Sequence, residues 1–187
     1  MTTLRQGLLD GRGVALAGGV PPTIGGALAA LGARVEGLDA VLGQGPDPDE
    51  DGASAWLQSG APLHALVYQA APAFGSGGQD GLRDCMERAW VAVRTVAVAA
   101  LIPAGAGKVV LIGPRVDAGP FAAAARAALE NLARTLSVEW ARYGVGAVAI
   151  APGVATTEDA LAELVCFLVS PAGEYFTGCA FELGRVR

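Results

Sequence analysis

Few side chains in this sequence could carry out acid–base chemistry, and they lie far apart along the chain. Tyr68 ends an apolar run, where a phenol could donate a proton, but no residue near it in the sequence would tune its pKa. Arg126 could hold a salt bridge or a phosphate, but a guanidinium does not titrate in a useful range. The one histidine, His64, lies early in the run that ends at Tyr68, and there we expect it to pack.

The three cysteines, Cys85, Cys166 and Cys179, are odd in number and irregular in spacing. This pattern predicts free thiols in a reducing cytosol rather than a disulfide framework. None of them has a histidine near enough in the sequence to suggest nucleophilic catalysis. Because no Cys/His cluster is present, we also expect no metal site.

Composition limits the classes of partner. The 187 residues are 52% hydrophobic and 17% charged, with a mean hydropathy of +0.44. This length predicts one domain over residues 1–187 with a substantial core. A chain this apolar exposes apolar surface to water unless another subunit buries it. We therefore expect a second subunit on part of its surface, in a dimer or tetramer. The formal net charge of −5 argues against nucleic acid or an anionic membrane as a partner.

The location of the protein is predicted from its apolar segments. Residues Met1–Asp10 mix polar and apolar side chains, and no cleavage-like run follows, so we expect no signal peptide. The most apolar stretch, Trp90–Ile102, is interrupted by Arg94 and is too short to span a bilayer. We therefore expect a cytoplasmic protein.

Apolar runs alternate with helical patterns along the whole chain. Strands are predicted at Gly13–Gly18, Arg34–Leu38, Leu63–Tyr68, Lys108–Ile112, Gly146–Ala151 and Cys179–Leu183. Helices are predicted at Ile24–Leu31, capped by Thr23, and at Ala53–Gln58, Gly81–Ile102, Pro120–Tyr143 and Glu158–Val169. Loops are predicted at Gly43–Gly52 and Phe74–Gln79. This alternation predicts an α/β fold, a doubly wound parallel sheet with helices on both faces in one three-layer domain.

Two of these helices carry unusual surfaces. From Ala89 onwards the helix Gly81–Ile102 is apolar nearly all round, which is typical of a helix covered on more than one side. The helix Pro120–Tyr143 starts with proline, and Phe121 and Trp140 belong to its predicted apolar stripe. Its N-terminal half is nearly all alanine, so another backbone could approach it closely.

The order of these motifs resembles the short-chain dehydrogenase/reductase family over essentially the whole chain. The segment 125–153, ARAALENLARTLSVEWARYGVGAVAIAPG, is similar to the active-site helix of that family and the Pro-Gly that follows the next strand. The segment 166–184 is similar to its closing helix, Thr-Gly turn and last strand. Residues 66–72, LVYQAAP, stand where the family has Asn-Asn-Ala-Gly. The resemblance implies a Rossmann-like fold.

The resemblance also places the catalytic residues of the family on this chain, and at each position a different residue stands in place of the catalytic one. The Tyr-x-x-x-Lys motif falls on Ala122 and Arg126, so the proton donor is absent. The serine that polarises the substrate carbonyl falls on Gly113, and the asparagine of the preceding helix on Ala89. We therefore expect no catalytic residue in the family positions.

The nucleotide loop that the resemblance implies is damaged as well. Gly18 and Gly19 are present, but Pro22, which follows Pro21, occupies the position of the middle glycine, and Gly25 comes one residue late. Two prolines remove two backbone donors from a phosphate cradle. Asp39 lies about where a carboxylate would bind an adenine ribose. We expect Gly18, Gly19, Gly25 and Asp39 to be vestiges and no cofactor to bind; NAD(P) is the alternative.

The chain is short in two places. Between Asp39 and Leu63 there is too little sequence for the helix, strand and helix usual in the family, and after Gly153 the substrate lid is missing. The resemblance then predicts a pseudoenzyme that pairs through helices 81–102 and 120–143 with an active homologue. That heteromeric dehydrogenase or reductase would act on a hydroxyacyl or ketoacyl thioester, a steroid or a polyketide.

Two other functions stay open. One is an NAD(P)-dependent oxidoreductase with unorthodox residues, which would use Tyr68 or Arg126. The other is a homomeric structural or binding module, similar to the structural half of a polyketide ketoreductase.

Overall fold

A single six-stranded parallel sheet forms the centre of the molecule. The computed structural model describes residues 4–43 and 47–184, and the strand order is β2-β1-β3-β4-β5-β6. Every neighbouring pair of strands runs parallel. The strands are β1 (Gly13–Ala17), β2 (Arg34–Gly37), β3 (Ala65–Gln69), β4 (Gly107–Ile112), β5 (Val145–Ala151) and β6 (Cys179–Glu182). All six predicted strands are therefore confirmed, with shifts of one or two residues at their ends.

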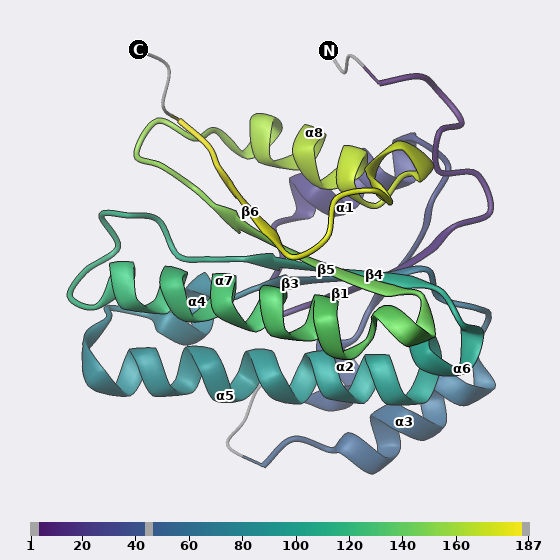
Figure 1. Cartoon of the computed structure of the whole chain (residues 1–187), viewed down its shortest axis with the longest axis horizontal. Coiled ribbons are helices and arrows are strands. Elements are labelled where there is room, and N and C mark those ends of the chain that lie inside the picture. Colours follow the sequence, from purple (N-terminus) through teal and green to yellow (C-terminus); the bar gives the residue numbers. More distant parts are fainter. Residues whose placement is uncertain (1–3, 44–46, 185–187) are drawn as a thin grey trace.

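Helices cover both faces of this sheet (Figure 1). One face carries α1 (Pro22–Ala30) and α8 (Glu158–Leu168), which pack on each other. The other carries α5 (Gly78–Val96) and α7 (Ala122–Glu139), together with α2 (Asp39–Leu42), α3 (Glu50–Ser59) and α4 (Ala71–Phe74). Alternate residues of the strands enter two separate buried clusters, one beneath each helix layer. The predicted three-layer, doubly wound fold is confirmed.

The segment between β2 and β3 is short, as expected from the sequence. It holds α2 and α3, and no strand lies between them in the described residues 38–43 and 47–64. The helix α2 was not predicted, and α3 begins at Glu50, inside the predicted loop Gly43–Gly52. The Asp49 side chain accepts a hydrogen bond of 2.8 Å from the Gly52 N–H, which caps α3 and explains its early start. Residues 44–46 of that predicted loop lie outside the described residues.

Helix α1 starts earlier than predicted. Pro21 is its N-cap and Pro22 its first residue, a position where a missing N–H costs little. Thr23 lies inside the helix, so the prediction that it caps α1 is wrong; its hydroxyl donates to the Glu158 carboxylate at 2.7 Å. On α8 the cap is Thr157, whose side chain accepts from the Ala160 N–H at 3.2 Å.

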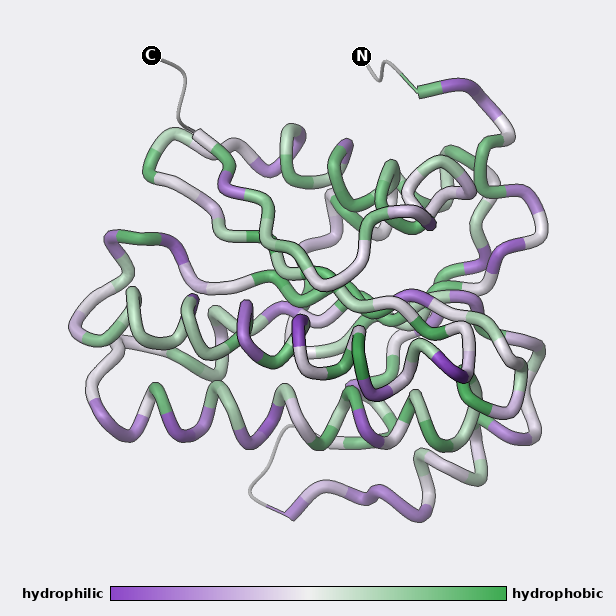
Figure 2. Tube along the Cα trace, viewed as in Figure 1, coloured by the Kyte–Doolittle hydropathy of each residue, from purple (hydrophilic) through white to green (hydrophobic). Residues whose placement is uncertain are grey.

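The long helix predicted at Gly81–Ile102 is a composite. It starts three residues earlier, as α5, continues through a π-helical turn at Ala97–Leu101 and ends in α6 (Ile102–Ala104). The predicted loop Phe74–Gln79 overlaps two helices, since Phe74 ends α4 and Gly78 begins α5. The first half of α5 is hydrophilic on its outer side and the second half more apolar (Figure 2).

The start of α7 also differs from the prediction. Pro120 does not begin the helix: Phe121 is the N-cap, with a φ of 68°, and the helix begins at Ala122. Phe121 is 53% exposed, so it does not belong to the buried stripe. The buried side chains of α7 are Ala122, Ala125, Leu129, Ala133 and Leu136. The helix ends at Glu139, a 3₁₀ turn follows, and Gly144 terminates the segment with a φ of 69°, as predicted.

No helix in residues 4–43 and 47–184 combines the length and the apolar character that crossing a membrane requires.

Candidate functional site

The carboxyl ends of the parallel strands define the edge where an open α/β sheet binds its ligands. Ligands lie in the crevice where the strand order reverses, which here falls between β1 and β3. Gly18 follows β1, Ala70 follows β3, Gly113 follows β4 and Pro152 follows β5. The predicted site residues Gly18, Gly19 and Gly113 therefore lie at this edge.

The glycine loop after β1 is bound by a side chain of the protein itself. The Gly18 N–H donates to Asp39 Oδ1 and the Gly19 N–H to Asp39 Oδ2, both at 2.8 Å. Both glycines have positive φ, near 79° and 73°. A carboxylate with two N–H donors is a charge-assisted, bidentate arrangement. The structure thus brings Asp39 to the loop, where its carboxylate accepts the hydrogen bonds that a phosphate would accept.

The start of α1 is no better suited to an anion. Pro21 and Pro22 carry no N–H, and the Ile24 N–H is bonded to the Pro21 carbonyl oxygen. The Glu158 carboxylate reaches Thr23 in the same first turn, so a second negative charge lies there. A helix start attracts a pyrophosphate through free N–H groups and positive potential, and this one offers little of either. The residues present therefore do not fit a dinucleotide pyrophosphate.

Gly25, the remaining glycine of the pattern, has a packing role. A Cβ added to it would lie 3.3 Å from Leu16 Cδ1 and 3.9 Å from Val35 Cγ1. These contacts place Gly25 against β1 and β2.

Arg126 is the one charged residue among the four family positions. Its Nη1 donates to the carbonyl oxygens of Pro114, at 3.3 Å, and of Pro152. Its Nη2 donates to the Ala151 carbonyl oxygen at 3.4 Å. The guanidinium therefore joins the chain after β4 to the chain after β5, and no carboxylate lies within salt-bridge distance of it among the described residues.

The other three positions bring no chemistry to this edge. Gly113 lies beside Arg126, since an added Cβ would be 3.5 Å from Arg126 Cγ. Ala122 lies one turn before Arg126 on α7 and is buried. Ala89 is buried within the core cluster on α5. None of the three can hold or move a proton.

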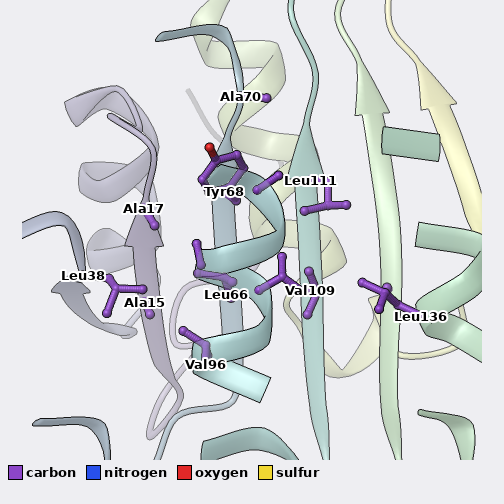
Figure 3. Close-up of a cluster of buried hydrophobic side chains, with 14 of the residues drawn as sticks. Ala15, Ala17, Leu38, Leu66, Tyr68, Ala70, Val96, Val109, Leu111 and Leu136 are labelled. Atoms are coloured by element: carbon purple, nitrogen blue, oxygen red, sulfur yellow. The ribbon is translucent and has the colours of Figure 1, made fainter. Parts of the chain in front are cut away.

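Tyr68 is the nearest phenol to this edge, and it is 2% exposed. Its ring lies above Leu66 in the cluster under α5, and its hydroxyl points towards the carboxyl end of β3 (Figure 3). The hydroxyl oxygen is buried and has no hydrogen-bond partner among residues 4–43 and 47–184. Burial raises the pKa of this phenol, so the group stays protonated at neutral pH.

Tyr68 also lines a cavity that the sequence did not predict. The cavity measures about 550 Å³ and lies between the ends of β1 and β3, α2 and α5. Its charged lining residues are Asp39, Asp84, Glu87 and Arg88. The i, i+3 and i+4 spacing of Asp84, Glu87 and Arg88 is the only signal that the sequence held for them, and it indicates no more than one helix face.

The remaining titratable candidates lie away from this edge. His64 Nδ1 accepts a hydrogen bond of 3.0 Å from the Gly13 N–H at the amino end of β1, and burial lowers the pKa of the imidazole. Cys85 and Cys166 are buried and Cys179 half-buried, and all three thiols are free. Burial raises the pKa of the Cys85 and Cys166 thiols to about 11, which makes them poor nucleophiles. No group of three or more potential metal ligands occurs within the described part of the chain.

Lys108 is a buried polar residue that the sequence reading missed. It is 5% exposed, near the start of β4, and its ammonium donates to the carbonyl oxygens of Gly173, at 2.9 Å, and of Phe176. Burial lowers the pKa of Lys108 to about 8. Lys108 ties the sheet to the turn before β6, at the edge opposite the glycine loop.

Comparison with known proteins identifies the fold. No protein-family model and no curated protein sequence matches the chain. Among solved structures, a citronellol catabolism dehydrogenase of Pseudomonas aeruginosa is similar over 97% of this chain and 96% of its own, with 22% identity and a TM-score of 0.72.

Two further dehydrogenases are similar at 19% identity. A gluconate 5-dehydrogenase from Burkholderia cenocepacia, solved with NADP and tartrate, has a TM-score of 0.69 over 94% of each chain. A hydroxysteroid dehydrogenase from Escherichia coli has a TM-score of 0.71 over 95% of this chain and 97% of its own. This chain therefore has the fold of the short-chain dehydrogenases, as its resemblance to that family implies.

Proposed function

We propose that this chain is a non-catalytic subunit that pairs with an active homologue of the same fold in a heteromeric dehydrogenase or reductase. The observation that carries the proposal is the environment of Arg126. Its guanidinium donates to three backbone carbonyl oxygens where the family has its Tyr-x-x-x-Lys pair, and Ala122 offers no proton donor there. An arginine bonded in this way spans the carboxyl ends of β4 and β5. Because its guanidinium does not titrate in a useful range, it cannot exchange a proton with a substrate.

The surface of α5 and α7 supports pairing. The two helices pack against each other on one face of the sheet (Figure 1). Trp90 on α5 is 42% exposed, and Val98 in the π-helical turn that continues α5 is 62% exposed, with Arg94 between them at a four-residue spacing. The exposed side of the first turns of α7 holds alanines, which let another helix approach closely. Exposed apolar side chains beside a stripe of small residues favour a protein partner.

The substrate belongs to the partner in this proposal. The classes we propose are a hydroxyacyl or ketoacyl thioester, a steroid or a polyketide. The similar Escherichia coli structure is a hydroxysteroid dehydrogenase, which agrees with the second class.

Co-expression with a catalytically complete homologue encoded beside this chain tests the pairing. We expect one complex of defined mass by size-exclusion chromatography with light scattering, and a change in the turnover of the homologue. Val98→Glu, in the π-helical turn after α5, should break the complex, whereas Val154→Glu, at an exposed site after β5, should leave it intact. Circular dichroism must show both variants folded. A stable homodimer that leaves the homologue unchanged contradicts the proposal and supports a homomeric module.

The second candidate function is an NAD(P)-dependent oxidoreductase with unorthodox residues. One finding favours it: the similar gluconate 5-dehydrogenase was solved with NADP. Titration with NADH and with NADPH separates the two functions, because a ligand at 100 times its Kd adds about 2.7 kcal/mol to the unfolding free energy. If neither NADH nor NADPH shifts the melting temperature, the oxidoreductase function is ruled out.

A further inference from the structure

The cavity beside Tyr68 is open to solvent on one side and is lined by parts of the chain that are far apart in sequence. Gly18 and Tyr68 come from the ends of β1 and β3, Leu42 from α2, and Val91 and Ala92 from α5. Its volume of about 550 Å³ falls within the range of small-molecule sites. Such sites combine apolar walls with a few polar groups, and this cavity has both.

The Tyr68 hydroxyl is the first observation that points to a ligand. The residue is 2% exposed, its hydroxyl oxygen is buried, and no group in the described chain bonds to it. A buried polar group without a partner carries a large desolvation cost. A phenol at the inner end of a cavity can donate one hydrogen bond and accept another, so a polar atom of a ligand placed there would remove that cost.

The charges of the lining determine which ligand fits. Three carboxylates, Asp39, Asp84 and Glu87, line the cavity with one guanidinium, Arg88. Arg83, outside the lining, also reaches Asp84 at 3.6 Å. Asp39 already accepts the N–H groups of the glycine loop, so those donors are not free to offset an incoming negative charge. A phosphate or carboxylate ligand would meet an excess of negative charge, whereas a cation would be attracted.

The apolar part of the lining, with Leu42, Pro72 and Val91, requires an apolar body on the ligand. From this combination we infer that the cavity binds a small organic cation, with an apolar body against α2 and α5 and an N–H group at the Tyr68 hydroxyl. This binding site goes beyond the proposed pairing and does not depend on it.

Three indole compounds that share one body and differ in charge test the inference. Isothermal titration calorimetry on the full chain uses tryptamine as the cation, tryptophol as the neutral compound and indole-3-acetate as the anion. We expect saturable binding of tryptamine, weaker binding of tryptophol and the weakest binding of indole-3-acetate. Equal affinities for the three compounds, or no saturable tryptamine binding at millimolar concentration, would overturn the inference.

Two variants link the result to named residues. Glu87→Gln should weaken tryptamine binding about 2- to 5-fold and leave tryptophol unchanged, since it removes one partly exposed charge. Glu139→Gln, at the exposed end of α7, is the matched control and should change neither. Tyr68→Phe should weaken both compounds by a similar factor, about 5-fold, through the loss of one hydrogen bond.

Other outcomes contradict the inference. Equal effects of Glu87→Gln and Glu139→Gln would mean that the cation binds elsewhere. Displacement of tryptamine by NADPH would make the cavity part of a nucleotide site, and it would also support the oxidoreductase over the non-catalytic subunit. A failure of pairing in the co-expression test would leave these titrations unaffected, so the two proposals fail independently.

Discussion

The Asp39 side chain occupies the backbone donors of the glycine loop after β1, which in a nucleotide-binding protein would bind a phosphate. Its carboxylate bonds to the N–H groups of Gly18 and Gly19, so the loop after β1 is stabilised from within the chain. Loops of this kind usually depend on a ligand to satisfy such donors. Asp39 therefore has a structural role in this protein that its spacing from the glycines did not reveal.

Asp39→Ala should lower the unfolding free energy by about 1.5–3 kcal/mol, because it removes two hydrogen bonds to a charged acceptor in a partly exposed loop. Urea denaturation followed by circular dichroism measures this change. Asp47→Ala removes an exposed carboxylate and should stay within about 0.5 kcal/mol of the unaltered chain. Equal effects from the two substitutions would contradict the structural role of Asp39.

At the scale of elements, the start of α7 depends on one unfavourable backbone conformation. Phe121 adopts a left-handed φ of 68° between Gly119 and the first helical residue, and its ring is exposed. Left-handed backbone costs a non-glycine residue roughly 1–2 kcal/mol. Because the residue is 53% exposed, its ring gains only part of the burial that could offset this strain.

Phe121→Gly should raise the unfolding free energy by about 0.5–1 kcal/mol, since glycine adopts this φ without strain but loses more conformational entropy on folding. Phe121→Ala removes the same ring and keeps the strain, so it should give no gain. Thermal melts of the two variants, compared with each other, isolate the backbone effect. A gain of the same size in the alanine variant would assign the effect to the ring instead.

The sequence predicts the elements of this fold better than their ends. The four inner strands, β1, β3, β4 and β5, are apolar runs, a signal that burial on both faces imposes. The start of α7 at Phe121 and of α1 at Pro21 depends on local backbone angles, for which the residue types gave the wrong indication. The helix α2 has four residues, too few to show a helical period.

The candidate site was predictable only in part, for a related reason. Gly18, Gly19 and Asp39 could be located from their spacing, and the loss of side chains at Ala122 and Gly113 could be read directly. The hydrogen-bond partners of Arg126 are backbone carbonyl oxygens, which every residue has. No pattern of side chains in the sequence therefore indicates them. The cavity beside Tyr68 depends on α2 and was therefore missed with it.

At the scale of the whole molecule, Lys108 joins the sheet to the segment before β6. The lysine is buried, and its pKa is lowered from 10.5 to about 8 by that burial. Between these values the unfolded chain binds more protons than the folded chain at this residue. The contribution of Lys108 to stability is therefore fully present above pH 10.5 and is lost as the pH falls through about 8.

The unaltered chain should gain stability relative to Lys108→Met as the pH rises from 7.5 to about 10, because the methionine variant has no titrating group at this position. Urea denaturation of both chains at matched pH values gives the difference. Taking the difference removes the opposite contributions of Cys85 and Cys166, whose raised pKa values titrate in the same range. A constant difference across this range would mean that Lys108 keeps its ordinary pKa.

The close approach of β1 and β3 has a consequence for detecting function from glycine motifs. A Cβ on Gly18 would lie 2.2 Å from the Gln69 carbonyl oxygen, a distance that no side chain can tolerate. The close approach of these two neighbouring strands thus demands glycine at this turn whether or not any ligand binds there. A motif search would score a chain that binds a dinucleotide and a chain that does not equally at this position. For proteins of this architecture, the first glycine of the fingerprint reports strand geometry, and cofactor binding must be judged from the donors that remain free.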